Sequence, residues 1–414
     1  MTADDHLADL ARRAAAAADS LADASDEQLA TALGAMAQRL AQARVELAAA
    51  NEQDVKTAEA AGMSAALLDR LRLGTDRLDD LAANLRLLAA TSPMIREVPV
   101  RDLGPDLELI ERRRPVGVIG VNYEARPNVT IDVASQLVKS RNAGVLRTGS
   151  AAIGSALALH RHVIAPALAA AGIDGDAIQV VGEPGHEYAN ALVRQPGLIR
   201  LVILRGSGAT TAALGAEAAR HGVRTLAHAE GGGVLYIDRA ADQATVRRLV
   251  REGTDRLGVC NRVNLVLVHE AVADAFEPAI RAELDAVGIA QSVPPLDHPI
   301  GHEWALDDGH EATVTLLRVA DELAAARLAN AETSGLAATI VTEDAAAARR
   351  FVDRYHGTGA FWNATTRLLD GFKLLAVPET GINVDHMPGP RGPVTFADLY
   401  LRQYLVQPKA APSG

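Results

Sequence analysis

The residue best suited to covalent chemistry is Cys260, the sole cysteine of the chain. It lies in the segment 256–263, RLGVCNRV, between an expected helix and a strand that starts near Asn264. The thiolate is the reactive form of cysteine, and Arg256, Arg262 and nearby backbone N–H groups would stabilise it. A buried structural cysteine is the alternative interpretation, because free cysteine is among the most buried residue types.

Two glycine-containing turns have the composition of nucleotide-binding sites. Residues 201–210, LVILRGSGAT, predict a strand, a turn with Gly206 and Gly208, and a helix whose first amides would face a pyrophosphate. The third glycine of the dinucleotide-binding fingerprint is absent, and an ordinary strand-to-helix turn explains the pattern equally well. Residues 147–150, RTGS, follow another strand and offer Arg147 and Ser150 to the 2′-phosphate of NADP, or form a surface turn.

Residues 297–303, DHPIGHE, place two histidines four positions apart beside an acid, as in some zinc sites. Pro299 and Gly301 would break the helix that such a site needs. We therefore expect no metal.

The composition is that of a soluble globular protein and excludes several functions. The 414 residues suffice for two or three domains, each with its own core. A net charge of -11 and 3% aromatic residues argue against nucleic acid as a partner, and the basic run 112–114 is expected to be a solvated edge. The single cysteine and the interrupted apolar stretches predict no internal disulfide, no export signal and no membrane span, so we expect a cytoplasmic protein.

Apolar periodicity divides the chain into two regions. Residues 3–92, rich in Ala, Leu, Arg and Asp with apolar positions three and four apart, predict several amphipathic helices. Short apolar runs then predict buried strands at 115–121, 144–147, 201–204, from about 234, at 264–268 and at 339–342. Alternating strands and helices predict two α/β lobes with parallel sheets, followed by a Pro/Gly-rich tail at 376–393 and a closing stretch at 394–406.

Taken together, these segments resemble the gamma-glutamyl phosphate reductase (glutamate-5-semialdehyde dehydrogenase) family, a branch of the aldehyde dehydrogenase superfamily. The most specific block is RPVGVIGVNYEARPNVTID at 114–132, which continues through KSRNA at 139–143 and LRTGS at 146–150. Further matches are NEQDV at 51–55, residues 65–71, RGSG at 205–208, Cys260-Asn261, NATTR at 363–367 with Asp370-Gly371, Glu379-x-Gly381 and RGP at 391–393. The resemblance covers nearly the whole chain.

The resemblance implies an aldehyde dehydrogenase-like α/β fold with a cofactor-binding lobe, a catalytic lobe and a small β oligomerisation element. The N-terminal helices and the NADP-binding domain would occupy residues 1–100 and 114–230, and the catalytic domain with Cys260 would occupy 231–375. The oligomerisation element would comprise 101–113 and 385–408. Because the family's last segment makes subunit contacts, we expect a homo-oligomer.

The same resemblance assigns roles to individual residues. Cys260 is the nucleophile, and Asn128 donates to the oxyanion. The cofactor is NADP, and the residues that face it are Arg147, Ser150, Gly206, Ser207 and Glu379, the last near the nicotinamide ribose. The residues implied for the substrate are Arg126, Asn261 and Arg391.

The chain departs from the family pattern at three places. Leu-Ala-Ala at 336–338 replaces a His-Ser/Thr-Asp triplet and is closer to general aldehyde dehydrogenases. HAEGGGV at 228–234 replaces Glu-Thr-Gly-x-Gly-Asn-Cys-His, and DHMPG at 385–389 replaces Gln-Lys-Leu-His. Since the ammonium and carboxylate of an amino acid need fixed counter-charges, these changes indicate another substrate or a rebuilt pocket.

The implied reaction is the NADPH-dependent reduction of gamma-glutamyl 5-phosphate, or a related acyl phosphate, to glutamate 5-semialdehyde and phosphate through a Cys260 thioester. This is a step of proline biosynthesis, and its partners are the small-molecule acyl phosphate or semialdehyde and a kinase that forms the acyl phosphate. An NAD(P)-dependent aldehyde dehydrogenase that acts on another substrate is the alternative, favoured by Leu336 and by Glu230 as a general base. A non-catalytic scaffold for the kinase is a third hypothesis, and retention of Cys260 and Asn128 argues against it.

Overall fold

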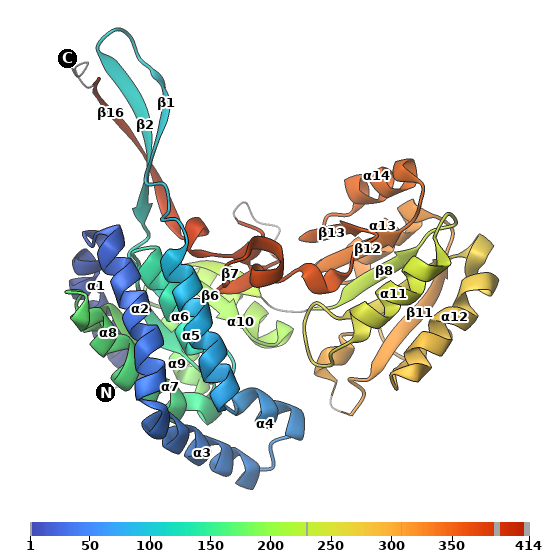
Figure 1. Cartoon of the computed structure of the whole chain (residues 1–414), viewed down its shortest axis with the longest axis horizontal. Helices are drawn as coiled ribbons and strands as arrows, with labels where there is room; N and C mark the ends of the chain where they lie inside the picture. The colour runs from blue at the N-terminus through green and yellow to red at the C-terminus, as the bar shows by residue number, and fades with distance from the viewer. Residues whose placement is uncertain (1, 229–230, 308, 385–389, 410–414) are drawn as a thin grey trace.

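Five helices form the start of the chain, as its apolar periodicity predicts (Figure 1). They are α1 (Ala3–Ala22), α2 (Asp26–Gln42), α3 (Arg44–Ala60), α4 (Ala65–Leu71) and α5 (Thr75–Ala90). Capping boxes begin α1 at Thr2 and α2 at Ser25, where each side chain accepts from a backbone N–H of the first turn. The computed structural model describes residues 2–228, 231–307, 309–384 and 390–409.

The first lobe contains a five-stranded parallel sheet in the order β5-β4-β3-β6-β7. The strands are β3 (Val118–Asn122), β4 (Ala143–Arg147), β5 (Ile178–Val180), β6 (Ile199–Arg205) and β7 (Arg224–His228). The helices of this lobe after α5 are α6 (Pro127–Lys139), α7 (Ile153–Leu159), α8 (Ala165–Ala170), α9 (His186–Leu192) and α10 (Gly208–Arg220). The chain order along the sheet reverses between β3 and β6, and the carboxyl ends of strands at such a point form a ligand-binding crevice.

The helical stretch Ser150–Ala170 has the length and composition of a membrane span, and it is the one such candidate in the ranges that the structure describes. Half of its apolar window is buried inside the protein. Leu159, Val163 and Leu168 lie in the same core as the strands of the first sheet. A core helix of a folded lobe accounts for the apolar composition of this stretch.

The second lobe contains a six-stranded parallel sheet in the order β10-β11-β9-β8-β12-β13. The strands are β8 (Gly233–Ile237), β9 (Val263–His269), β10 (Ala290–Ser292), β11 (Thr313–Val319), β12 (Ala337–Val341) and β13 (Gly359–Trp362). The helices are α11 (Gln243–Thr254), α12 (Ala273–Ala286), α13 (Glu322–Glu332) and α14 (Ala345–Arg354). Cys260 lies in the connection between α11 and β9, so the amino end of a buried strand positions it.

A three-stranded antiparallel arm projects away from both lobes (Figure 1). It consists of β1 (Glu97–Asp102), β2 (Leu107–Pro115) and β16 (Tyr400–Pro408). The predicted oligomerisation element began at 101 and 385, whereas the strands begin at 97 and 400, and residues 385–389 lie outside the described ranges. The assignment of these ranges as domains, and of the arm to subunit contacts, stays a prediction.

The Pro/Gly-rich tail contains regular structure that the sequence did not indicate. The short strands β14 (Gly381–Asn383) and β15 (Gly392–Val394) pair antiparallel. β14 also lies against β7 of the first lobe, because Ile382 N–H donates to His228 Nδ1. The α/β class and the two parallel sheets are as predicted.

Candidate active site

Backbone hydrogen bonds from the second sheet hold Cys260 in place. Its carbonyl oxygen accepts from Gly232 N at 2.7 Å, and Arg262 O accepts from Gly233 N at 2.6 Å. The neighbouring Asn261 is buried, and its side-chain amide donates to Leu369 O at 3.1 Å. Asn261 therefore fixes the loop that carries Cys260, and its contact with substrate stays a prediction.

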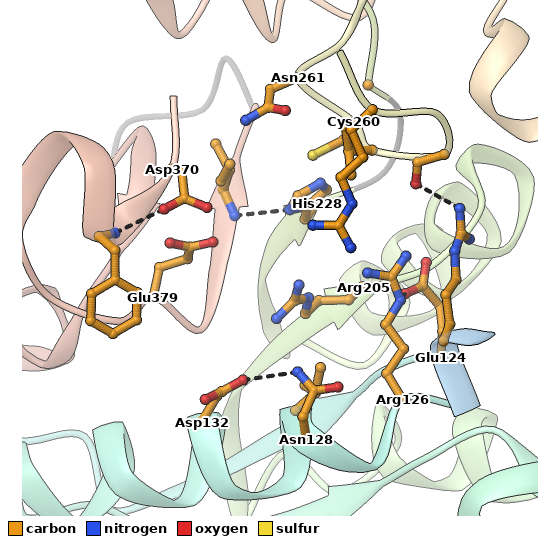
Figure 2. Close-up of a pocket in the computed structure, with 18 of the residues that line it drawn as sticks. Glu124, Arg126, Asn128, Asp132, Arg205, His228, Cys260, Asn261, Asp370 and Glu379 are labelled. Atoms are coloured by element: carbon orange, nitrogen blue, oxygen red, sulfur yellow. Dashed lines mark hydrogen bonds and ion pairs between the residues drawn. The ribbon is translucent and has the colours of Figure 1, made fainter. Parts of the chain in front are cut away.

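Cys260 opens into a cavity of about 550 Å³ to which both lobes contribute (Figure 2). Asn128 lines the opposite side of this cavity, on the first turn of α6. Pro127 occupies the start of that helix, where its fixed φ suits the first helical position. The predicted site residues that the cavity brings together are Cys260, Asn128, Arg126, Asn261, Gly206 and Glu379.

Two arginines reach into this cavity from the first lobe, Arg126 just before α6 and Arg205 at the end of β6 (Figure 2). Arg126 pairs with Glu124 at 3.2 Å, and Arg205 Nη1 donates to Thr380 O at 3.1 Å. Guanidinium groups in a partly desolvated cavity attract anionic oxygens. Sequence reasoning missed Arg205, although its position at the carboxyl end of a strand beside the chain reversal is the signal that marks such residues.

The environment of the Cys260 thiol differs from the sequence expectation. Burial removes water from the Cys260 thiol and raises its pKa to about 11. The positive charge of Arg205 lowers this pKa, but by less than burial raises it. Arg262, expected to stabilise the thiolate, is buried and donates to Thr313 O at 2.5 Å. Arg256 does line the cavity. The Cys260 side chain is therefore a protonated thiol at neutral pH.

Carboxylates also line the cavity, and burial changes their ionisation. Burial raises the pKa of Asp132 to about 6 and that of Glu379 to about 7, the latter helped by the charge of Asp370. Glu379 accepts a hydrogen bond from Gly371 N. Glu303, which sequence reasoning considered only within the histidine-containing segment, accepts from Asn264 Nδ2 at 2.7 Å. The cavity thus offers fixed charges of both signs.

Three residues predicted to face the cofactor lie at the carboxyl edge of the first sheet without lining the cavity. Arg147 is buried and donates to Asn122 Oδ1 at 3.2 Å and to Gly185 O at 2.9 Å. Ser150 is exposed, and the exposed Ser207 precedes α10 with its hydroxyl bonded to Thr210 Oγ1 at 3.0 Å. Their roles at a cofactor stay predictions.

Arg391, predicted to bind substrate, lies outside the cavity lining. Its guanidinium donates to His356 O at 2.7 Å and to Val384 O at 3.3 Å. Of the segments that depart from the family pattern, 229–230 and 385–389 lie outside the described ranges, and so does the proposed base Glu230. Leu336 is buried in an apolar cluster against which Cys260 packs.

The histidine-containing segment at 297–303 forms an aromatic cluster. His298 and His302 lie against the Trp304 ring, with centroid distances of 4.8 and 4.5 Å. His302 Nε2 lies 2.9 Å from Asp307 Oδ2. Within the residues that the structure describes, no group of three His, Cys, Asp or Glu side chains has the arrangement of a metal site.

Comparisons with known proteins identify the family and the fold of this chain. The sequence profile of the aldehyde dehydrogenase family matches residues 2–299. A gamma-glutamyl phosphate reductase from Moorella thermoacetica is 35% identical over 396 residues, which cover 92% of this chain and 93% of that protein. The crystal structure of gamma-glutamyl phosphate reductase from Thermotoga maritima superposes with a TM-score of 0.89 at 27% identity, covering 97% of this chain and 98% of the other.

A more distant structure shares the fold alone. A propionaldehyde dehydrogenase from Clostridium phytofermentans has a TM-score of 0.74 at 14% identity, with 99% of this chain and 98% of that chain covered. The aldehyde dehydrogenase-like fold that the sequence predicts is therefore confirmed. The chain belongs to the aldehyde dehydrogenase family, within its gamma-glutamyl phosphate reductase branch.

Proposed function

We propose that this protein catalyses the NADPH-dependent reduction of gamma-glutamyl 5-phosphate to glutamate 5-semialdehyde and phosphate, a step of proline biosynthesis. The observation that carries the proposal is the convergence of Cys260, Asn128, Arg126 and Arg205 on one cavity. The reductase from Moorella thermoacetica supports it across most of the chain. A nucleophile, an oxyanion donor and two cations are the groups that an acyl phosphate requires.

In the proposed mechanism, the Cys260 sulfur attacks the acyl carbon, and its proton passes to the departing phosphate. The new S–C bond forms, the carbon–oxygen bond to phosphate breaks, and phosphate leaves with the electron pair, so that a thioester remains. The Asn128 amide and the Cys260 backbone N–H donate to the oxygen that becomes negative during this attack. Arg126 and Arg205 stabilise the negative charge of the phosphoryl group.

The carboxyl edge of the first sheet fits a nicotinamide cofactor. Ser207 precedes α10 but makes no side-chain cap, which leaves the first-turn N–H groups of that helix for a pyrophosphate. Gly206 has room beside it, since an added Cβ would meet only Thr211 Oγ1, at 3.7 Å. The bound nicotinamide would supply the hydride that reduces the thioester. We propose NADP over NAD, with Arg147 and Ser150 near the 2′-phosphate.

The glutamate end of the substrate needs counter-charges, and the cavity offers them. Glu303 and Asp132 are carboxylates that suit an ammonium group, while Arg70 and Lys373 lie in the same lining and suit a carboxylate. The cavity therefore supports the view that the pocket has been rebuilt around an amino-acid substrate.

We also propose that the arm joins subunits into a homo-oligomer and that the reaction takes place in the cytoplasm. The arm exposes large apolar side chains, which support a subunit contact: Val100, Leu107, Leu401, Tyr404 and Val406. A lone catalytic thiol stays reduced in the cytoplasm. A kinase that forms the labile acyl phosphate would be the functional partner. Light scattering of the native protein and of Leu401→Glu tests the oligomer, and an unchanged molar mass would contradict the assignment of the arm.

The reaction itself is tested in the reverse direction. Glutamate semialdehyde should reduce NADP⁺ in repeated turnovers only when inorganic phosphate is present, because phosphate must release the acyl group from Cys260. Cys260→Ala should abolish turnover and keep cofactor binding. Steady oxidation that is independent of phosphate, with release of free acid, would instead establish the hydrolytic aldehyde dehydrogenase.

A further inference from the structure

His228, at the end of β7, has its two ring nitrogens in different environments. Nδ1 lies 2.9 Å from the backbone N of Ile382 (Figure 2). A backbone N–H only donates, so Nδ1 must present its lone pair and the single proton of the neutral ring is on Nε2. The pairing of β7 with β14 therefore selects one tautomer of this histidine.

The other side of the ring belongs to the cavity. The two nitrogens of an imidazole point in diverging directions, so Nε2 points away from Ile382, and His228 lines the same cavity as Cys260 and Asn128. Among the described residues, none accepts a hydrogen bond from Nε2. A half-buried N–H donor thus lies on the wall of the reaction cavity, available to an acceptor that the protein does not supply.

The surroundings keep this ring neutral. Burial, together with the positive charges of Arg205 from β6 and Arg126 before α6, lowers the pKa of His228 to about 3. At neutral pH the ring therefore neither gives up nor takes up a proton. It can act only as a hydrogen-bond donor through Nε2–H.

We propose that His228 is a further catalytic residue, whose Nε2–H donates a hydrogen bond to a negatively charged oxygen of the substrate beside Cys260. The proposal rests on the proposed function, in which two oxygens fit. One is the acyl oxygen, which becomes negative when the S–C bond forms, and the other is a phosphoryl oxygen. An oriented neutral donor stabilises either charge without reorganisation.

Two substitutions distinguish the role of Nδ1 from that of Nε2. In His228→Asn, the side-chain oxygen can still accept from Ile382 N–H, while the donor that faces the cavity is lost. In His228→Gln, the longer amide reaches the position of Nε2 and can still donate. His160→Gln is the matched control, since His160 is half-buried with Nε2 2.7 Å from Ile178 O and lies outside the cavity lining.

The kinetic experiment uses glutamate semialdehyde and NADP⁺ in rapid mixing, first without phosphate and then with varied phosphate. If Nε2 serves the acyl oxygen, His228→Asn slows the first-turnover burst of NADPH roughly 100-fold, and His228→Gln restores part of it. If Nε2 serves a phosphoryl oxygen, the burst is unchanged and the KM for phosphate rises about tenfold or more. If His228→Asn shows the same burst rate and the same KM for phosphate as the wild type, the proposal is overturned, provided that His160→Gln also matches the wild type.

A second measurement does not depend on turnover. Long-range ¹H–¹⁵N spectra of the ¹⁵N-histidine-labelled protein, assigned by the signal lost in His228→Asn, should show Nε2 protonated and Nδ1 unprotonated from about pH 5.5 to about pH 8. A proton on Nδ1, or titration within this range, would overturn the proposal. If wild-type turnover proves independent of phosphate, the proposed function fails, while the burst and the spectra still decide the role of His228.

Discussion

The Asn128 amide nitrogen donates to the Asp132 carboxylate at 3.2 Å, across one turn of helix α6. An amide carries two N–H groups, so this bond uses one and leaves the other for the oxygen beside Cys260. Asp132 lies in the wall of the same cavity, and burial raises its pKa to about 6. In the proposed mechanism, Asp132 is therefore a positioning residue that sets the direction of the Asn128 amide.

Replacing Asp132 should lower the rate through Asn128. We expect Asp132→Ala to reduce kcat about tenfold with little change in the KM for phosphate, because the amide becomes free to rotate and part of the oxyanion stabilisation is lost. Asp132→Asn, which can still accept the hydrogen bond, should retain more activity. The wild-type kcat should also fall below about pH 6, where the Asp132 carboxylate becomes protonated, and Asp132→Asn should lack this component. Identical pH profiles of kcat for the wild type and Asp132→Asn would contradict the positioning role of Asp132.

The free enzyme should be a slow nucleophile at neutral pH. Burial raises the pKa of Cys260 to about 11, so the thiolate fraction grows about tenfold per pH unit at lower pH. Alkylation by iodoacetamide without cofactor or substrate should therefore accelerate from pH 7 to pH 9 with no plateau. A plateau at or below about pH 8 would show that Arg205 and Arg126 outweigh burial. Cys260→Ala gives the background, since the chain has no other cysteine.

The central strands of the two parallel sheets, β3, β4 and β6 in the first and β8, β9 and β12 in the second, were predictable because a buried parallel strand needs an uninterrupted apolar run. Residues 118–122 and 263–268 are buried throughout, and the sequence shows both runs. The identity of Cys260 as a candidate came from residue type, and that of Asn128 from the resemblance. Neither identification requires knowledge of which distant residues lie close together in the fold.

The charges around Cys260 could not be predicted in the same way. The sequence suggested Arg256 and Arg262, which are close along the chain, but Arg262 turns into the second lobe. The positive charge comes instead from Arg126 and Arg205, which the first lobe brings across the cavity. The direction of the pKa shift was also missed, because burial depends on how the two lobes close around the thiol.

Cofactor affinity should depend on the ionisation of Glu379. Burial and the charge of Asp370 raise its pKa to about 7, so the Glu379 carboxylate, which we propose accepts from the ribose hydroxyls, is present above that pH and is lost below it. The Kd for NADP should therefore rise as the pH falls from about 8 to about 6. Fluorescence titration should show this dependence in the wild type and a weaker, flat affinity in Glu379→Gln. If the Kd for NADP still depends on pH in Glu379→Gln, the titrating group is a residue other than Glu379.

Asn51 should be a major determinant of stability. This buried side chain donates to Leu71 O at 2.9 Å and to Ser155 Oγ at 3.0 Å, and accepts from Leu73 N at 2.7 Å. It thus joins the N-terminal helices to α7. Asn51→Ala leaves buried groups without partners and should lower the free energy of unfolding by roughly 2–4 kcal/mol in urea denaturation. The exposed Gln53→Ala on the same helix should change it by less than about 0.5 kcal/mol, and equal effects would contradict this account.

A side chain at position 231 should displace the nucleophile. A Cβ added to Gly231 would lie 2.5 Å from Cys260 Cα and against its carbonyl oxygen, and both are backbone atoms that cannot yield without moving the loop. Since a small misplacement of reacting groups costs roughly 100-fold, Gly231→Ala should lower kcat by about that factor. Gly215→Ala is the control, because its added Cβ meets nothing within 4 Å and replaces a glycine inside helix α10. That variant should keep full activity and unfold at a slightly higher temperature, whereas a fully active Gly231→Ala would show that the Cys260 loop tolerates displacement.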